Sequence, residues 1–107
     1  MKLQQMRFVV AIADNQLNVS NAAKALYTSQ PGISRQLRLM EEELDLVIYK
    51  RKGKLITGIT EQGEYVLAGF REVLNKVGEI KHLSKSIALE QEKIKATNHE
   101  QYYAIAV

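Results

Sequence analysis

Apolar residues recur every three or four positions in the amino-terminal part of the chain, which is the spacing of amphipathic helices. The first predicted helix ends at the polar pair Asp14-Asn15, and its apolar face consists of Leu3, Met6, Val9, Val10 and Ala13. A second, shorter helix is predicted after Ser20, whose hydroxyl is placed to cap it. Its inner face has the small residues Ala22 and Ala23 beside Leu26, which favours close contact with a neighbouring helix.

A third helix is predicted to begin at Ser29, which can cap it, with Pro31 in the first turn where a missing N–H leaves nothing unpaired. Its buried stripe consists of Ile33, Leu37, Met40 and Leu44. The opposite face offers amide, hydroxyl and guanidinium groups, which donate hydrogen bonds to base edges and phosphates. These groups belong to Gln30, Ser34, Arg35 and Arg38. The two short helices between Val19 and Leu44 therefore predict a helix-turn-helix that presents its second helix to the DNA major groove.

The periodicity changes after the third helix. Two β-favouring runs, Val47-Ile48-Tyr49 and Leu55-Ile56-Thr57, enclose a basic stretch that contains a glycine, which predicts a small hairpin. The basic residues are Lys50, Arg51, Lys52 and Lys54. Beside a helix-turn-helix such a wing would hold phosphates or enter a minor groove, with Arg51 as its strongest candidate. The acidic residues Glu41, Glu42, Glu43 and Asp45 precede the wing, so the charges are separated along the chain.

A long final helix is predicted from Thr60, its cap, with Glu61 in the first turn to complement the helix dipole. Its apolar positions alternate in steps of four and three, a heptad seam that Ser84 interrupts. The predicted dimerisation residues on this seam are Val66, Phe70, Val73, Val77, Ile80 and Ile87. A helix of about thirty residues is roughly 45 Å long, more than three short helices can cover. We expect its first half to pack on the first helix and the remainder to pair with a second copy.

Composition and charge agree with an ordinary globular protein. The chain has 107 residues, 46% of them hydrophobic, and a net charge of +3. The absence of cysteine excludes a disulfide framework, a thiolate metal site and a cysteine nucleophile. No apolar run approaches the roughly 20 residues of a membrane span, and no signal-peptide core precedes the first helix. We therefore expect a cytoplasmic protein without a membrane partner.

No catalytic site, metal site or cofactor site is predicted. The two histidines, His82 and His99, have neither metal-ligand spacing nor a set of acidic partners. No glycine-rich phosphate loop occurs, and the carboxylates at 41 to 43 are neighbours at a helix end rather than a positioned acid and base. The expectation is that the chain is not an enzyme.

Each of these features also has a plainer interpretation. Capped helix starts are common, a basic loop is more often solvated than bound to a ligand, and the heptad seam could pack entirely within its own chain. The combination is more specific, because two helices of suitable length, small residues at their contact, a short turn and a basic outer face rarely occur together by chance.

The order of these motifs resembles the amino-terminal domain of LysR-type transcriptional regulators over residues 1 to 90. The resemblance rests on Ala22-Ala23 with Leu26, Ser29-Gln30-Pro31, Ser34-Arg35-Gln36-Leu37, Glu41 with Glu43-Leu44, Ile48-Tyr49-Lys50-Arg51, and Thr60 with Gly63. Within the family, the chain resembles the CysB and Cbl subgroup, which controls sulfur assimilation and cysteine synthesis. That likeness rests on Leu17 to Ser20, Tyr27 to Ser34, Gly53-Lys54 and Thr57 to Thr60.

The resemblance implies a mainly α fold, a winged helix-turn-helix with three helices and a β-hairpin wing, followed by a long dimerising linker helix. It implies that Gln30, Pro31, Ser34 and Arg35 approach bases or neighbouring phosphates. It implies further that Thr28, Ser29 and Arg38 hold the DNA backbone and that Arg51 serves the wing. A two-lobed effector domain normally follows in this family.

Three departures from the family pattern stand out. Asp45 occupies a position where glycine usually ends the recognition helix, and Leu39 replaces a frequent arginine. Residues 96 to 101 resemble the subgroup's first effector-domain strand and anion-binding turn, with Glu100 in place of threonine. The strand-like run 94–97 and the apolar run 102–107 are followed by no further element. We expect a fragment or a truncated product without an effector pocket, so effector binding is not expected.

The sequence thus predicts a winged helix-turn-helix over residues 1–59, a linker and dimerisation helix over 60–92, and the start of an effector domain over 93–107. The predicted function is sequence-specific binding of double-stranded DNA as a homodimer, with a tetramer left open. A second hypothesis makes the chain an oligomerisation partner that modulates full-length regulators without binding DNA by itself. A third is that another winged-helix family is being mistaken for this one, although other winged domains lack the long heptad helix directly after the wing.

Overall fold

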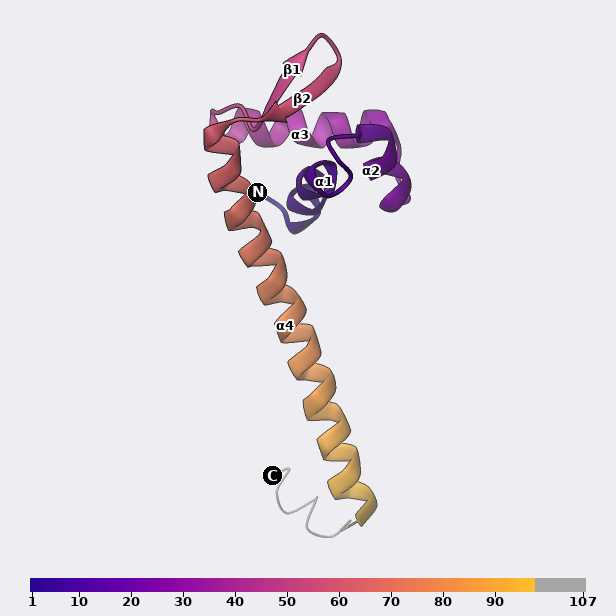
Figure 1. Cartoon of the computed structure of the whole chain (residues 1–107). Helices are drawn as coiled ribbons and strands as arrows, with labels where there is room; N and C mark the ends of the chain where they lie inside the picture. Colours follow the sequence, from indigo (N-terminus) through magenta and orange to yellow (C-terminus); the bar gives the residue numbers. More distant parts are fainter. Residues whose placement is uncertain (98–107) are drawn as a thin grey trace. The chain divides into compact units, whose positions relative to one another are not determined.

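The computed structural model describes residues 1–97, which form four helices and one two-stranded antiparallel sheet (Figure 1). The elements are α1 (Leu3–Asp14), α2 (Val19–Ala25), α3 (Gln30–Leu44), β1 (Tyr49–Lys52), β2 (Leu55–Ile59) and α4 (Glu61–Thr97). The mainly α fold with a hairpin between the third and fourth helices confirms the predicted fold class. Two compact units divide this chain, residues 1–74 and the part from Asn75 onward, and each is described by itself.

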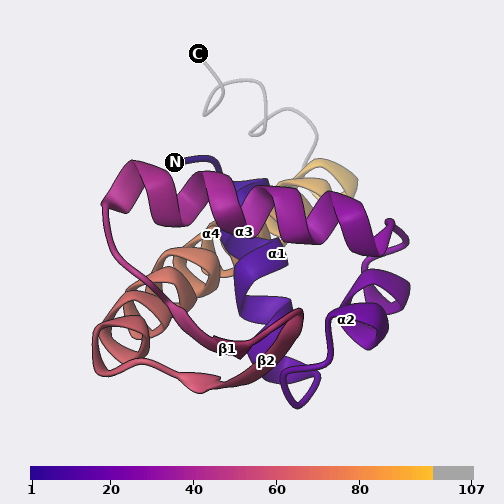
Figure 2. The same ribbon diagram turned by 90° about the horizontal axis from the view of Figure 1, so that it is seen from above.

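The first unit is built around one apolar core. Helices α1, α2 and α3 contact one another, and the hairpin lies beside them (Figure 2). The predicted stripes of α1 and α3 do face this core, although Leu3 is exposed and Leu44 only half-buried. The core also takes Ala11 and Ile12 from α1, which the predicted stripe omitted. Its remaining buried members are Ala22, Ala23, Ile48, Tyr49, Ile56, Leu67 and Phe70.

Side-chain caps fix the starts of the helices. Ser29 Oγ accepts a hydrogen bond from Gly32 N at 3.1 Å, and Thr60 Oγ1 accepts one from Gly63 N at 2.8 Å, which confirms both predicted caps. The prediction that Ser20 caps α2 is wrong. Asn18 does so by accepting from Asn21 N at 2.9 Å, because the helix begins one residue before Ser20.

Left-handed residues end α2 and α3. Tyr27 follows α2 with φ 53°, and Asp45 follows α3 with φ 52°, a region that L side chains adopt at some cost. At Tyr27 the backbone closes the helix through Tyr27 N to Lys24 O and Thr28 N to Ala23 O, the Schellman arrangement. At Asp45, the position where the family usually has glycine, an aspartate adopts the left-handed conformation.

The hairpin is shifted slightly from its predicted position. Strand β1 begins at Tyr49, so Val47 and Ile48 lie outside it, while β2 extends past Thr57 to Ile59. The register pairs Tyr49 with Ile59, Lys50 with Gly58, Arg51 with Ile56 and Lys52 with Leu55, with an irregularity between Lys50 and Arg51. Tyr49 and Ile48 are completely buried, so the hairpin is anchored at its base. Gly53 has φ 61° at the tip, where the turn needs a left-handed residue.

Helix α4 starts against the base of the hairpin. Gly63 is required there because a Cβ at this position would overlap the backbone carbonyl of Ile48. Leu67 and Phe70 are buried in the core, with Val66 and Leu74 half-buried against it, so the amino-terminal part of α4 packs within its own chain as predicted.

From Asn75 to Thr97 the second unit is helical. The prediction of a strand over 94–97 is wrong, because α4 continues to Thr97. The β-favouring residues of that run extend an existing helix. Extension adds one hydrogen bond per residue and does not require a new helix nucleation step. The predicted effector-domain segment from residue 98 onward lies outside the described residues. No helix within residues 1–97 is long and apolar enough to cross a membrane.

Candidate nucleic-acid interface

The outer face of α3 carries the side chains that the sequence singled out. Gln30, Pro31, Ser34, Arg35 and Arg38 are exposed, whereas the stripe containing Ile33, Leu37 and Met40 is buried. The helical repeat of 3.6 residues produces this division, since the apolar positions share one side and the polar positions share the other. The face therefore presents a row of hydrogen-bond donors next to the amino-terminal end of the helix.

The turn before α3 adds two hydroxyl groups. Ser29 is exposed and Thr28 is half-buried. A Cβ at Gly32 would stand 3.0 Å from Ser29 Oγ and 3.4 Å from Thr28 Oγ1, so both hydroxyls lie close to the first turn of α3. Ser29 Oγ accepts from Gly32 N, and its own hydroxyl hydrogen can still donate to a phosphate.

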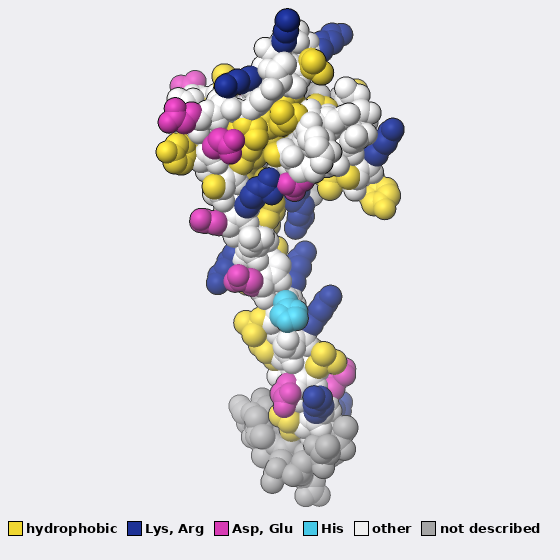
Figure 3. Space-filling view, in the orientation of Figure 1, with side chains coloured by type: hydrophobic (Ala, Val, Ile, Leu, Met, Phe, Trp, Pro, Cys, Tyr) yellow, Lys and Arg dark blue, Asp and Glu magenta, His cyan; other side chains and the backbone are white. Residues whose placement is uncertain are grey.

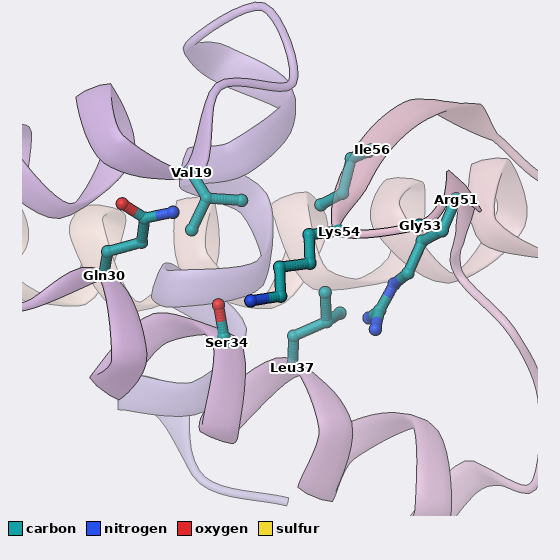
Figure 4. A pocket seen from close by; sticks show the side chains of 8 residues that line it. All are labelled: Val19, Gln30, Ser34, Leu37, Arg51, Gly53, Lys54 and Ile56. Atoms are coloured by element: carbon teal, nitrogen blue, oxygen red, sulfur yellow. The ribbon is translucent and has the colours of Figure 1, made fainter.

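A cleft separates α3 from the hairpin. We call it the helix–wing cleft, and it is lined by Val19, Gln30, Ser34, Leu37, Arg51, Gly53, Lys54 and Ile56. Figure 4 shows Gln30 and Ser34 on its α3 side and the Lys54 side chain extending from the hairpin toward them. Leu37, Val19 and Ile56 supply its apolar surface. The cleft thus brings two of the four predicted base-contacting residues, Gln30 and Ser34, together with Arg51 and Lys54 of the predicted wing. The other two, Pro31 and Arg35, do not line it.

The hairpin concentrates positive charge. Lys50, Lys52 and Lys54 are all exposed, and none of them forms an ion pair among residues 1–97. Lys and Arg side chains project from this part of the first unit in Figure 3. Arg51 differs from the lysines, because its Nη2 atom lies 3.0 Å from Glu41 Oε1.

Glu41 is a site residue that the sequence analysis missed. Its side chain is only 14% exposed, and its Oε2 atom accepts hydrogen bonds from Ile48 N at 2.7 Å and Tyr49 N at 3.5 Å. The available signal was its position four residues after Leu37, which places it at the edge of the buried stripe. In the sequence alone, Glu41, Glu42 and Glu43 form one acidic cluster, although only Glu41 lies at the edge of the buried stripe.

The neighbouring acidic residues have separate partners. Glu42 lies 3.9 Å from Arg38 Nε across one helical turn, and Glu43 lies 2.8 Å from the amino-terminal ammonium of Met1. Within residues 1–97 no group of three or more potential ligands could hold a metal ion. His82 is exposed on α4, and His99 lies outside the described residues.

The predicted dimerisation seam divides between the two units. In the first unit Phe70 is buried and Val66 half-buried, and both line an apolar groove with Met1, Met6, Leu44, Gly69 and Val73. In the second unit Ile80 is 58% exposed and Ile87 is 49% exposed, while Val77 is half-buried. The exposed apolar residues of α4 also include Leu83 and Leu89, which the predicted seam omitted.

Comparison with known proteins also indicates a helix-turn-helix regulator. Residues 3–64 match the family of bacterial regulatory helix-turn-helix proteins of the lysR type. The chain is similar to the transcriptional regulator CysB of Haemophilus influenzae, with 53% identity over 76 residues that cover 71% of this chain and 24% of that protein. It is 37% identical to CysB of Burkholderia cenocepacia over 108 residues, which cover 98% of this chain and 34% of that protein. The chain thus spans about a quarter to a third of the length of these relatives.

The chain is also similar to two solved DNA-binding domains in complex with DNA. The DNA-binding domain of BenM bound to benA site 1 DNA matches 82% of this chain and 97% of its own, with a TM-score of 0.74 and 30% identity. The DNA-binding domain of CbnR in complex with DNA matches 82% of this chain and 99% of its own, with a TM-score of 0.72 and 32% identity.

Proposed function

Because the chain belongs to the lysR family of bacterial regulatory helix-turn-helix proteins, whose DNA-binding domain it contains, we propose that it binds specific double-stranded DNA as a dimer. The observation that carries this proposal is the helix–wing cleft, where Gln30 and Ser34 of α3 line the same site as Lys54 of the hairpin. In this proposal the donors of Gln30 and Ser34 discriminate bases and the Lys54 ammonium binds a phosphate, the two kinds of contact that recognition of a duplex combines.

We assign the side chains of α3 and of the turn before it to two tasks. Gln30, Ser34 and Arg35 contact base edges in the major groove, because amide, hydroxyl and guanidinium groups match the donor and acceptor patterns displayed there. Thr28, Ser29 and Arg38 contact phosphates beside the groove, and Pro31 approaches bases or a neighbouring phosphate. In the hairpin, Lys50, Lys52 and Lys54 neutralise phosphates without reading sequence.

Dimerisation through α4 would supply the second copy, since one helix-turn-helix reads only half of a site. Ile80 and Ile87 support this proposal because apolar side chains at heptad spacing favour pairing with another helix. In this proposal residues 1–59 bind DNA and residues 60–92 link the copies, while residues 93–107 begin an effector domain. A tetramer remains an alternative assembly.

The regulated genes belong, in our proposal, to sulfur or cysteine metabolism. The likeness to CysB proteins supports this assignment. The relatives named above are transcriptional regulators rather than enzymes. A cytoplasmic location follows from the proposal, because a bacterial regulator acts where the chromosome lies.

Fluorescence anisotropy of the isolated chain on duplexes from sulfur-assimilation promoters tests this function. We expect submicromolar binding that resists an excess of random competitor DNA. Binding that the competitor removes as readily as the label would contradict sequence-specific recognition.

The second candidate function is an oligomerisation partner, favoured by the exposed apolar residues of α4. Such a chain would form mixed dimers with full-length regulators and show no detectable DNA binding by itself. Co-purification with a full-length regulator, together with a flat anisotropy titration, would select this candidate over the first.

A further inference from the structure

Glu41 joins the recognition helix to the hairpin through three hydrogen bonds. The residue lies in the last turn of α3, and its Oε2 atom accepts from Ile48 N at 2.7 Å and from Tyr49 N at 3.5 Å, just where the chain enters β1. Its Oε1 atom accepts from Arg51 Nη2 at 3.0 Å, two residues into that strand. One carboxylate therefore holds both the start of the hairpin and the arginine side chain of its first strand.

The strand pairing does not provide this constraint by itself. The hydrogen-bond ladder is irregular between Lys50 and Arg51, where the register shifts by one residue. Such irregularities bend a strand and redirect its side chains. A two-stranded hairpin is also only marginally stable alone, so its position against α3 depends on contacts at its base.

We propose that Glu41 is a positioning residue that holds the hairpin in place against α3. In this proposal Arg51 stabilises that contact through its ion pair with Glu41 and does not bind phosphate. This inference rests on the proposed function, because it concerns how the two DNA-contacting elements are held together. The phosphate contacts of the hairpin then come from Lys50, Lys52 and Lys54, which have no ion pair among the described residues.

For removal of the Glu41 carboxylate, the proposal predicts a change in DNA affinity opposite in sign to the one that charge repulsion alone would give. Removing a carboxylate from a DNA-binding surface normally raises affinity, because one like charge fewer faces the phosphates. Glu41→Gln keeps an oxygen that can accept from Ile48 N but cannot balance the Arg51 guanidinium. We therefore expect Glu41→Gln to weaken DNA binding, because the hairpin loses its fixed place.

The experiment measures anisotropy of the full chain on one specific duplex at several salt concentrations. Glu41→Gln should lose about three- to tenfold in affinity, the range expected for a coupled contact network. Glu43→Gln makes the same charge change two residues along α3 and should bind as tightly as the parent chain or slightly tighter. Arg51→Gln should weaken binding with an unchanged salt slope, whereas Lys52→Gln should reduce that slope by about one.

A second comparison distinguishes positioning from general loss of stability. In a chain with Lys50, Lys52 and Lys54 all changed to glutamine, Glu41→Gln should cause no further loss of affinity, because the hairpin has no phosphate contacts left to position. An equal loss in both backgrounds would overturn the proposal. So would tighter binding and a steeper salt slope for Glu41→Gln, which would mean that the released Arg51 binds phosphate.

Amide hydrogen exchange tests the anchoring role of Glu41 independently of DNA binding. Faster exchange at Ile48 and Tyr49 in Glu41→Ala than in Glu43→Ala supports the anchoring role without DNA, and unchanged exchange contradicts it. If the parent chain binds no duplex, the proposed function fails together with the role of Glu41 in DNA binding. If the parent binds and Glu41→Gln binds equally well, only the present inference fails.

Discussion

The phenolic hydroxyl of Tyr49 donates a hydrogen bond to the carbonyl oxygen of Val9 at 2.6 Å. This contact joins the first residue of β1 to the middle of α1, 40 positions earlier in the chain. Tyr49 is completely buried, so the base of the hairpin is part of the core even though its tip is in solvent. The tip of the hairpin is therefore attached to the buried core of the first unit.

Burial raises the pKa of Tyr49 well above its ordinary value of about 10. The folded state thus holds the phenolic proton more tightly than the unfolded state does. Its contribution to stability is complete below pH 10 and is lost as the pH rises from there toward the folded-state pKa. We expect the free energy of unfolding to fall above pH 10 in urea titrations.

Tyr49→Phe removes this titrating group and provides the control. At neutral pH the variant should lose about 1 kcal/mol with the hydrogen bond. Above pH 10 the difference in the free energy of unfolding between the parent chain and Tyr49→Phe should disappear. A parallel alkaline loss of stability in both proteins would assign the effect to other groups.

Gly63→Ala should destabilise the first unit by about 2 kcal/mol, the cost of forcing a methyl group into a filled site. The added Cβ would overlap the backbone of Ile48, which cannot rotate away as a side chain could. Gly69→Ala is the matched control on the same helix, where a Cβ meets nothing within 4 Å. It should raise stability by up to about 1 kcal/mol through helix propensity. Thermal unfolding measures both, and equal shifts would contradict the steric argument.

Asp45→Gly should stabilise the fold by about 1 kcal/mol. Asp45 has a left-handed φ of 52° after α3, and glycine adopts that region without the clash of a Cβ. Asp45→Ala retains the Cβ and should not gain stability. Chemical denaturation of the three proteins tests this, and a gain for alanine as large as for glycine would show that the charge, not the backbone, is responsible.

Arg35→Ala and Lys52→Ala should affect DNA binding in different ways. Loss of a base-contacting guanidinium should cost roughly 1 to 3 kcal/mol on the specific duplex and relax the preference at one base pair. Loss of Lys52 should weaken specific and random duplexes alike and lower the salt dependence. Anisotropy on both duplexes separates the two, and an equal loss for Arg35→Ala on each would refute its assignment to bases.

If the chain dimerises through α4 as proposed, Ile80→Asp should shift it from dimer to monomer. Ile80 lies on the heptad seam with more than half of its side chain exposed, so pairing through α4 would bury the new charge unpaired. His82→Asp places a charge two positions away, off the seam, and should leave the dimer intact. Sedimentation velocity gives the result, and a parent chain that is monomeric at micromolar concentration would count against the seam.

Local chemistry explains which parts of the fold were predictable. Ser29, Pro31 and Thr60 mark helix starts through interactions within four residues, so the sequence alone located them. Asn18 and Ser20 are both residue types that favour caps, so the sequence alone did not decide between them. The run 94–97 favours a strand by composition, yet it follows a helix that has already formed.

The site was less predictable than the fold because its key contacts are not local. The exposed donors of α3 follow from helical periodicity, and the lysines of the hairpin follow from their clustering. The contact between Glu41 and Arg51 joins residues ten positions apart through the turn after α3. Nothing in the spacing of charges indicated that the two would meet, or that one carboxylate would also bind the backbone of Ile48.

The open tip of the hairpin has a consequence for how such a domain can diverge. A Cβ at Gly53 would meet no atom within 4 Å, and Lys52 and Lys54 on either side of it are exposed. A lysine at position 52 can be gained or lost over evolutionary time without disturbing the core or the helix–wing cleft, because Lys52 is exposed and does not line that cleft. Changes at this position would adjust general attraction to DNA. If α3 selects the operator, as proposed, that choice could be inherited unchanged while the occupancy of the operator is tuned.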